Sequence, residues 1–232
     1  GFGASNANRE LVCWMRTFNT GRPPAEQVRF AGFDGPLEIT AAESPRQALV
    51  ALHGYLAARV DAALLPCTAD TLDGLLGTDD RWSDPAAMRN PARSVGQTPE
   101  ARHLRLLADD LNALLDTQTP ELIATSSPDE WDRARLYGRT AAGLLRYHHW
   151  LADTSPGRIG WLLGVRASMM AANLLACTEA LVHAGNGHLQ RDRSSMQMGG
   201  GPVPWWSAGA IVGAQLGEEY AFIATAVGAI RH

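Results

Sequence analysis

The chain has 232 residues, of which 46% are hydrophobic and 19% charged, a composition typical of a globular protein large enough to bury a core. Its net charge is −4 and its 20 basic residues are scattered arginines, which argues against a nucleic-acid-binding protein. Lysine is absent, which excludes a Schiff-base lysine, a phosphate-loop lysine and a Ser-Lys dyad from this sequence.

The sequence also predicts a cytoplasmic protein that does not enter a membrane. No apolar run reaches the roughly 18 residues that suggest a membrane span, and no secretory signal opens the chain at Gly1. The three cysteines, Cys13, Cys67 and Cys177, lie far apart and form no CxxC pair, which suits a reducing compartment.

The N-terminal part is predicted to contain one helix and one hairpin. Apolar residues recur at helical spacing over residues 8–18, from Leu11 to Phe18. Alternating apolar residues then begin at Val28 and end at Ile39, on either side of a turn at residues 33–36. A two-stranded ribbon is marginally stable alone, so we expect it to lie against helices or a partner subunit.

The rest of the chain is predicted to be helical, because Ser or Thr precedes Pro five times ahead of an apolar helical pattern. A Ser or Thr oxygen caps a helix, and Pro suits the first helical position. The pairs are Ser44-Pro45, Thr98-Pro99, Thr119-Pro120, Ser127-Pro128 and Ser155-Pro156. The helices expected are 45–64, 71–76, 99–116, 128–152, 156–184 and 206–230, with a long loop at 77–97 and a polar connection at 185–204.

We therefore predict an all-α fold, a bundle of about six to eight helices with a small N-terminal β-hairpin. Residues 1–232 would form a single helical domain, with 1–44 as an appendage and 45–232 as the helical core. The last predicted helix is rich in Gly and Ala, which lets a neighbouring surface come close. That neighbour is another helix or a flat ring, and a second copy of the chain would form a homo-oligomer.

Histidines are the main candidates for chemistry, because imidazole titrates near neutral pH and binds metals. Helical spacing turns His53 inward and puts His149 at the border of an apolar stripe. His183 continues an inward row on predicted helix 156–184 and follows Glu179 by one turn, close enough for the carboxylate to orient its ring. The alternative for each is a core histidine with its own hydrogen-bond partner. No HExxH, GxSxG, GxGxxG or phosphate-loop motif is present.

A glycine run before the last predicted helix is a candidate ligand site. Residues 196–206 read MQMGGGPVPWW. Glycine lets backbone amides approach a ligand, and a following helix N-terminus favours an anionic group such as a carboxylate. Trp205 and Trp206 would flank an aromatic substrate. The alternative is a flexible linker whose tryptophans fill the core.

The order of features between His183 and Trp206 resembles a known enzyme layout. A histidine late in a long helix, a glycine-rich loop and a further helix are arranged as in the histidine-ligated haem-dependent aromatic oxygenases. This tryptophan-dioxygenase-like superfamily includes the bacterial haem-dependent tyrosine hydroxylases. His53 in an early helix is a second point of resemblance, whereas the dioxygenase loop GTGGSSG differs from the Gly-Gly-Gly-Pro of residues 199–202.

The resemblance implies an oxidoreductase with a haem iron that hydroxylates or dioxygenates an aromatic amino acid. His183, or failing that His188, would bind the iron, and His53, with His149 as the alternative, would act on the distal side. Arg166 would hold the substrate carboxylate. The further substrate-binding residues would be Gly199, Gly200, Gly201, Trp205 and Trp206.

Two other functions compete with this one. The first is a non-enzymatic helical bundle that binds a ligand or regulates a partner, with its histidines bonded inside the core. The second is the helical domain of a larger transferase, because residues 173–186 resemble the C-terminal bundle of aminoglycoside-type nucleotidyltransferases. The Gly-Ser and Asp-x-Asp core of those enzymes is missing here.

Overall fold

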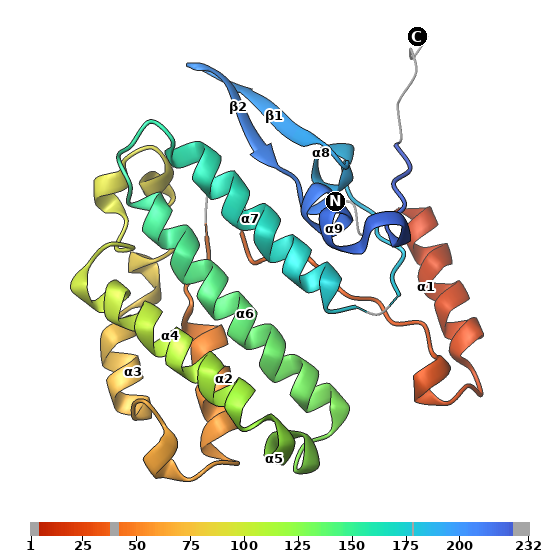
Figure 1. Ribbon diagram of the computed structural model, residues 1–232, viewed down its shortest axis with the longest axis horizontal. Coiled ribbons are helices and arrows are strands. Elements are labelled where there is room, and N and C mark those ends of the chain that lie inside the picture. The colour runs from red at the N-terminus through yellow and green to blue at the C-terminus, as the bar shows by residue number, and fades with distance from the viewer. Residues whose placement is uncertain (1–4, 38–41, 178, 225–232) are drawn as a thin grey trace. The chain divides into compact units, whose positions relative to one another are not determined.

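The computed structural model of the protein describes residues 5–37, 42–177 and 179–224 (Figure 1). The chain forms two compact units, Gly1–Phe33 and Asp34–His232. Most described residues are helical, as predicted, and two strands form one small antiparallel sheet. No helix in these three ranges has the length and hydropathy that spanning a bilayer demands.

The first unit is one helix followed by a looped segment. Helix α1 (Asn6–Asn19) begins where the Ser5 side chain accepts a hydrogen bond from the Asn8 amide. Behind it, the Asn19 side chain exchanges two hydrogen bonds of 2.9 Å with the backbone of Val28. None of the residues of α1 is buried, so its apolar face is uncovered within this unit.

The predicted N-terminal hairpin is not found among the described residues. Residues 28–36 contain no strand, and the pairing here is a single bridge between Leu37 and Ala42. The predicted second strand extends to Ile39, which lies outside the described residues. Leu37 is buried against the helical core instead of pairing with the Val28 segment.

The second unit contains the remaining α-helices of the described residues, and the longest of them pack side by side in Figure 1. They are α2 (Arg46–Ala57), α3 (Ala69–Leu76), α4 (Pro99–Thr117), α5 (Thr119–Ala124), α6 (Pro128–Leu151), α7 (Arg158–Leu175), α8 (Asn186–Leu189) and α9 (Ala208–Leu216).

At two of the five Ser/Thr-Pro pairs, the Ser or Thr caps a helix that begins at the following Pro, as predicted. Thr98 accepts a hydrogen bond from the Ala101 amide, and Ser127 forms the predicted reciprocal capping box with Glu130. Ser44 accepts instead from the Arg46 amide, and α2 begins one residue later than expected. Helix α7 begins at Arg158, and it ends at Leu175 rather than near residue 184.

Helix α6 lies at the centre of this unit, in contact with α2, α4 and α7. One face packs into a leucine-rich core shared with α2, α3 and α4, in which Leu52, Leu104 and Leu111 are fully buried. A second face packs against α7, with Leu144 and Tyr147 in the contact. Apolar burial of this extent supplies most of the stability of such a fold.

The predicted loop at 77–97 is a series of packed turns rather than an open segment. Three short 3-10 turns follow one another, Asp79–Arg81, Pro85–Met88 and Pro91–Arg93. The Trp82 indole donates to the Leu76 carbonyl at 2.8 Å. The buried Arg158 guanidinium donates to the Ala87 and Met88 carbonyls at 3.0 and 2.9 Å, so α7 holds this segment in place.

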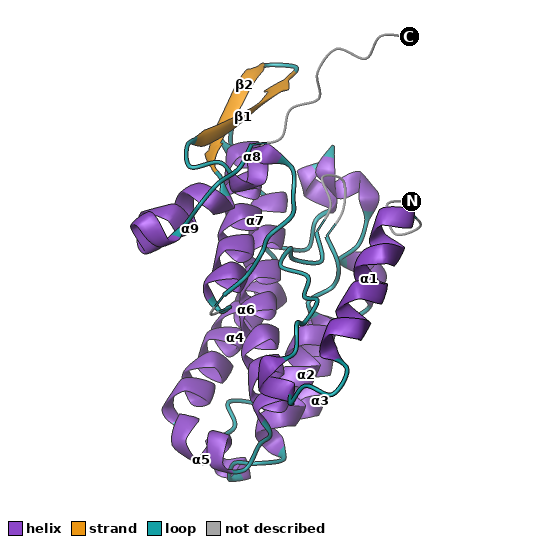
Figure 2. Ribbon diagram, turned by 90° about the vertical axis from the view of Figure 1, so that its right-hand side faces the viewer, coloured by secondary structure: helices purple, strands orange, loops and turns teal. Residues whose placement is uncertain are grey.

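The polar connection at 185–204 contains the sheet that the sequence analysis missed. Strands β1 (Arg193–Met198) and β2 (Gly201–Trp206) pair antiparallel, with Met198 opposite Gly201. Figure 2 shows this hairpin and α5 at opposite ends of the helical unit. Prolines at two positions of β2 weaken a strand pattern in the sequence, and an edge strand of a two-stranded ribbon tolerates them.

The last helix is much shorter than predicted. Helix α9 ends at Leu216, because Gly217 adopts a left-handed φ of +59° that closes the helix. A Cβ at Gly209 would lie 1.9 Å from the Leu189 carbonyl oxygen, so a small residue is required for close packing inside the unit. The homo-oligomer proposed for this helix stays a prediction, and residues 225–232 lie outside the described residues.

Candidate functional site

An arginine and an aspartate from distant parts of the chain meet on the surface of α7. The Arg166 Nε donates to Asp34 Oδ1 at 3.1 Å, and its Nη2 donates to Oδ2 at 2.5 Å. This two-pronged arrangement matches the planar guanidinium to the planar carboxylate. The side chains remain 20% and 38% exposed, respectively, so a small molecule can reach both.

Two neighbouring contacts hold Asp34 in this place. Gly35 packs so tightly on α7 that a Cβ there would lie 2.7 Å from the Met169 Cε. Leu37 is then buried in the core between α6 and α7. The segment that carries Asp34 is therefore fixed on α7 by a close backbone approach and an apolar anchor.

The charges of Arg166 and Asp34 both act on the imidazole of His188. His188 lies on the short helix α8 and is half-buried. Burial lowers its pKa below the ordinary 6.5, the positive charge of Arg166 lowers it further, and the negative charge of Asp34 opposes both. The ring is consequently neutral at neutral pH, the state in which it can accept a proton.

The charge of Arg166 also acts on Tyr147 of α6, and we call Asp34, Tyr147, Arg166 and His188 the Arg166 site. The Tyr147 side chain is buried, and burial raises its pKa above 10.0, against the opposing charges of Arg166 and Arg158. Its phenol therefore keeps its proton at neutral pH and is a hydrogen-bond donor. Two of these four residues, Arg166 and His188, were sequence candidates.

The inward-turned histidines are not gathered around one cavity. His53 is buried as predicted, and its Nε2 lies 3.0 Å from the Cys67 carbonyl oxygen. His149 lies at the end of α6. Burial is the main cause that lowers its pKa, and the charges of Arg105 and Arg102 lower it further. His183 is exposed, because α7 ends before it and residues 179–185 are not helical.

The glycines and tryptophans that were predicted to bind a ligand lie in the hairpin of β1 and β2. Gly199 and Gly200 form its exposed two-residue turn, and Gly201 opens β2 with a φ of +119°. Trp205 is half-buried opposite Ser194 in the sheet. Trp206 is 53% exposed with the Arg193 guanidinium 4.8 Å from its ring centre. The glycine amides precede a strand here, not a helix N-terminus as the ligand-binding proposal required.

Asp34 and Tyr147 were the residues that the sequence analysis missed. Residues 33–36 were assigned to a hairpin turn, because Phe-Asp-Gly-Pro is a common turn sequence. Tyr147 has no role in any pattern of the sequence that predicts a site. Neither residue stands in a local motif with Arg166 or His188, so the site had no signal of fixed spacing.

In the described residues, no group of three or more His, Cys, Asp and Glu side chains is arranged to hold a metal ion. The Arg166 site is instead one carboxylate paired to one guanidinium, with a neutral imidazole and a phenol near the guanidinium. Such a group can move a proton and stabilise a developing negative charge.

Comparison with protein families identifies the relatives of this chain. A family model described as erythromycin esterase matches residues 2–231. The chain belongs to the erythromycin esterase family. Searches of curated proteins and of solved structures found no match.

Membership of the erythromycin esterase family corrects the function inferred from the histidine layout. This is a family of hydrolases, so the resemblance to haem-dependent aromatic oxygenases was wrong. The predictions of an oxidoreductase, a haem iron bound by His183 or His188, and an aromatic amino acid substrate are withdrawn with it. The non-enzymatic bundle and the nucleotidyltransferase domain do not match the family either.

Proposed function

We propose that this chain hydrolyses a carboxylic ester and that the Arg166 site carries the reaction. The family supports hydrolysis, and its printed name supports an ester as the bond that is cleaved. The observation that carries the proposal is the neutral imidazole of His188 beside the Asp34-bound guanidinium of Arg166. Ester hydrolysis needs a base for water and a positive group for the oxyanion.

His188 is the proposed general base. Its neutral ring accepts a proton from a water molecule while the water oxygen forms a bond to the ester carbonyl carbon. The carbon–oxygen bond to the alcohol group then breaks, and protonated His188 returns the proton to the departing alkoxide. The products are a carboxylic acid and an alcohol, and water is the only co-reactant.

Arg166 is the proposed oxyanion partner. Attack by water turns the carbonyl oxygen into an oxyanion, which a fixed guanidinium stabilises more than it stabilises the neutral ester. Asp34 occupies two of the donors of Arg166 and fixes the plane of the guanidinium. The Tyr147 phenol is a second donor near Arg166, since burial keeps it protonated.

The test is the hydrolysis of a panel of esters, including erythromycin. The rate is measured from the acid released while the pH is held constant. We expect His188→Asn to lower kcat about 10²- to 10⁴-fold, the usual contribution of a general base. His183→Asn is the matched control, because it changes an exposed histidine in the preceding loop. Equal losses in the two variants, or unchanged hydrolysis in His188→Asn, would refute the assignment. Release of acid from no ester of the panel would refute the reaction itself.

A further inference from the structure

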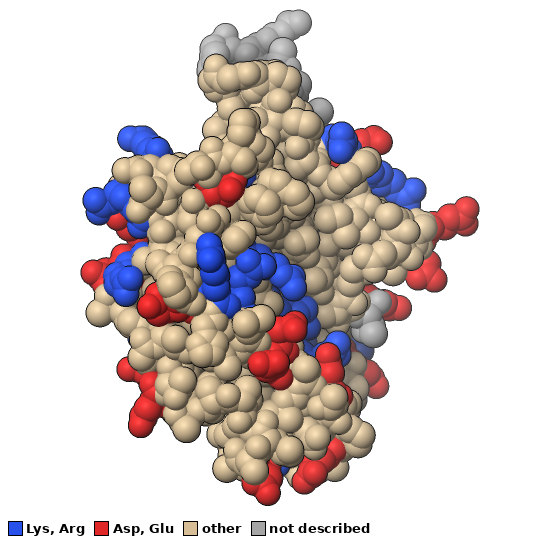
Figure 3. All heavy atoms as spheres, turned by 60° about the vertical axis from the view of Figure 1, so that its left-hand side comes forward, with Lys and Arg blue, Asp and Glu red and all other residues tan. Residues whose placement is uncertain are grey.

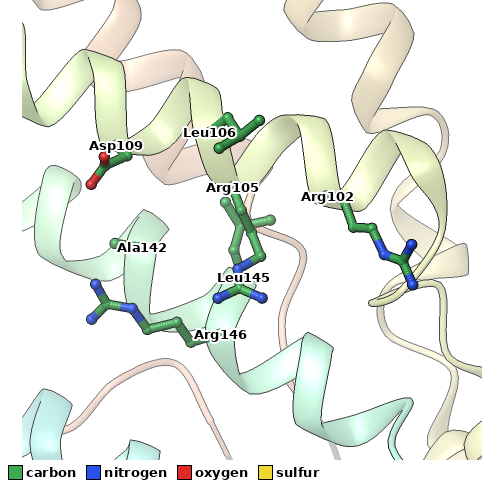
Figure 4. Close-up of a pocket in the computed structure, with 7 residues that line it drawn as sticks. All are labelled: Arg102, Arg105, Leu106, Asp109, Ala142, Leu145 and Arg146. Atoms are coloured by element: carbon green, nitrogen blue, oxygen red, sulfur yellow. The ribbon is translucent and has the colours of Figure 1, made fainter.

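A second group of arginines lines a groove between α4 and α6. The groove has a volume of about 390 Å³. Its lining residues are Arg102, Arg105, Leu106, Asp109, Ala142, Leu145 and Arg146 (Figure 4). Ligand sites for small molecules begin at about this size.

The three arginines of the groove reach solvent and have no acidic partner among the described residues: Arg102 and Arg146 are exposed, and Arg105 is half-buried. Arg46, Arg59 and Arg93 each form an ion pair with an aspartate or glutamate. Within the residues that the structure describes, the side chains of Arg102, Arg105 and Arg146 form no ion pair and no hydrogen bond. Asp109 is the one acidic residue in the lining, so the groove keeps a positive balance.

The guanidinium groups are spread along the groove rather than gathered at one point. Figure 4 shows Arg102 and Arg105 extending from α4, while Arg146 extends from α6 on the other side of Arg105. Figure 3 shows arginine side chains gathered in the middle of one face of the surface. A row of separate positive charges fits an extended anion better than a single carboxylate, which engages one guanidinium at a time.

His149, at the end of α6, is affected by the charges of the groove. Its Nδ1 is buried and has no hydrogen-bond partner among the described residues. Its pKa is lowered by burial first and by the charge of Arg105 next, with a further contribution from Arg102 and an opposing one from Asp153. The pKa of His149 can therefore report an anion that binds to Arg102 and Arg105.

The groove also offers an apolar surface beside the charges. Leu106 is 66% exposed, an unusual state for a leucine flanked by buried positions on an amphipathic helix. Ala142 and Leu145 form the opposite wall on α6. A ligand with an anionic chain and an apolar or aromatic body would use both parts.

We propose that this groove binds a small organic molecule that carries two or more linked phosphates. A phosphate has several acceptor oxygens and up to two negative charges, so a linked pair can accept hydrogen bonds from guanidiniums at successive places. The organic body lies over Leu106. The groove shares α6 with the Arg166 site but has no lining residue in common with it, and its ligand is proposed independently of ester hydrolysis.

Calorimetric titration with ADP and with pyrophosphate at low ionic strength tests this site. We expect both to bind, and ADP to bind more tightly, because pyrophosphate lacks the body that covers Leu106. Arg105→Gln and Arg146→Gln should each weaken binding about tenfold through loss of charge-assisted hydrogen bonds. Arg133→Gln is the matched control, since Arg133 is exposed on α6, does not line the groove and carries the same charge.

An NMR titration of His149 locates the bound anion. Phosphates that neutralise Arg102 and Arg105 should raise the pKa of His149, because those charges lower it in the free protein. Absence of ADP and pyrophosphate binding would overturn the proposal. Equal weakening in Arg133→Gln, or binding that leaves the His149 titration unchanged, would assign the anion to the general surface and overturn it as well. If ADP bound no more tightly than pyrophosphate, the proposed contact between the organic body and Leu106 would be wrong.

Discussion

Arg166 holds Asp34, which lies 132 positions earlier in the chain, through hydrogen bonds of 3.1 and 2.5 Å. Because both donors come from one rigid guanidinium, the pair fixes an orientation as well as a distance. The pair is partly exposed, so its contribution to folding is small, below about 1 kcal/mol. Its main consequence is the fixed position of the positive charge near His188.

Asp34→Asn should therefore impair hydrolysis much more than folding. The amide keeps one acceptor but loses the negative charge, so Arg166 is held less firmly, and we expect kcat to fall about 10- to 100-fold. Thermal unfolding should change little. Asp110→Asn, an exposed aspartate on α4, is the control. A large loss of thermal stability with unchanged kcat would show that Asp34 serves the fold instead.

Arg166→Lys should show that the shape of the guanidinium matters beyond its charge. Lysine presents one compact ammonium, which cannot bond both Asp34 oxygens and face a substrate in a fixed plane. We expect kcat to fall about 10²- to 10³-fold, as for other oxyanion donors, with a smaller change in KM. Steady-state kinetics gives kcat and KM for Arg166→Lys, and Arg133→Lys, which changes an exposed arginine on α6, is the control. Full activity in Arg166→Lys would leave only a requirement for positive charge.

The pH profile of kcat/KM should report the His188 imidazole. Its folded pKa lies below 6.5, so the neutral, active form already predominates at neutral pH, and the rate should fall as the pH decreases below that pKa. The two neighbours shift this limb in opposite directions. Arg166→Gln should move it to higher pH, whereas Asp34→Asn should move it to lower pH, because Arg166 lowers the pKa and Asp34 raises it. Shifts of the same sign in both variants would contradict the arrangement.

The helical part of the fold could be predicted from short-range chemistry, and the site could not. Thr98 and Ser127 cap their helices as the Ser/Thr-Pro pattern indicates, because capping involves neighbours three residues apart. The burial of His53 likewise follows from helical spacing. The Asp34–Arg166 pair depends on how one loop folds back on α7, which no local pattern encodes.

His183 and His188 show why a small error in a helix end changes a site. The sequence predicts a long helix that continues to residue 184, which places His183 on an inward row. Helix α7 ends at Leu175, so His183 is exposed and His188, on its own short helix, is half-buried beside Arg166. The preference between these two histidines was set by a helix boundary, the least reliable part of a sequence-based prediction.

His148 should make the protein less stable in mild acid. Its ring is fully buried, its Nε2 lies 2.8 Å from the Glu43 carbonyl oxygen, and burial lowers its pKa to about 4. The unfolded chain binds the proton near pH 6.5 and the folded chain only near 4, so stability falls as the pH decreases through this window. The full effect is about 3 kcal/mol. Urea unfolding at several pH values measures the unfolding free energy as a function of pH. This free energy should depend less steeply on pH in His148→Gln than in the wild type. An equal dependence on pH in the two proteins would mean that His148 does not titrate as proposed.

Gly96→Ala should be strongly destabilising, because the backbone of the 77–97 segment contacts α6 directly at this point. A Cβ at Gly96 would lie 1.8 Å from the His148 carbonyl oxygen, a contact that only a shift of the backbone can relieve. Overpacking of this kind costs about 1–3 kcal/mol or more. Gly54→Ala is the matched control, since Gly54 lies within α2, is exposed and has nothing within 4 Å of an added Cβ. There the substitution should stabilise the helix by about 0.5–1 kcal/mol. We expect the unfolding free energy to decrease in Gly96→Ala and to increase in Gly54→Ala. An unchanged unfolding free energy in Gly96→Ala would show that the segment is not held against α6.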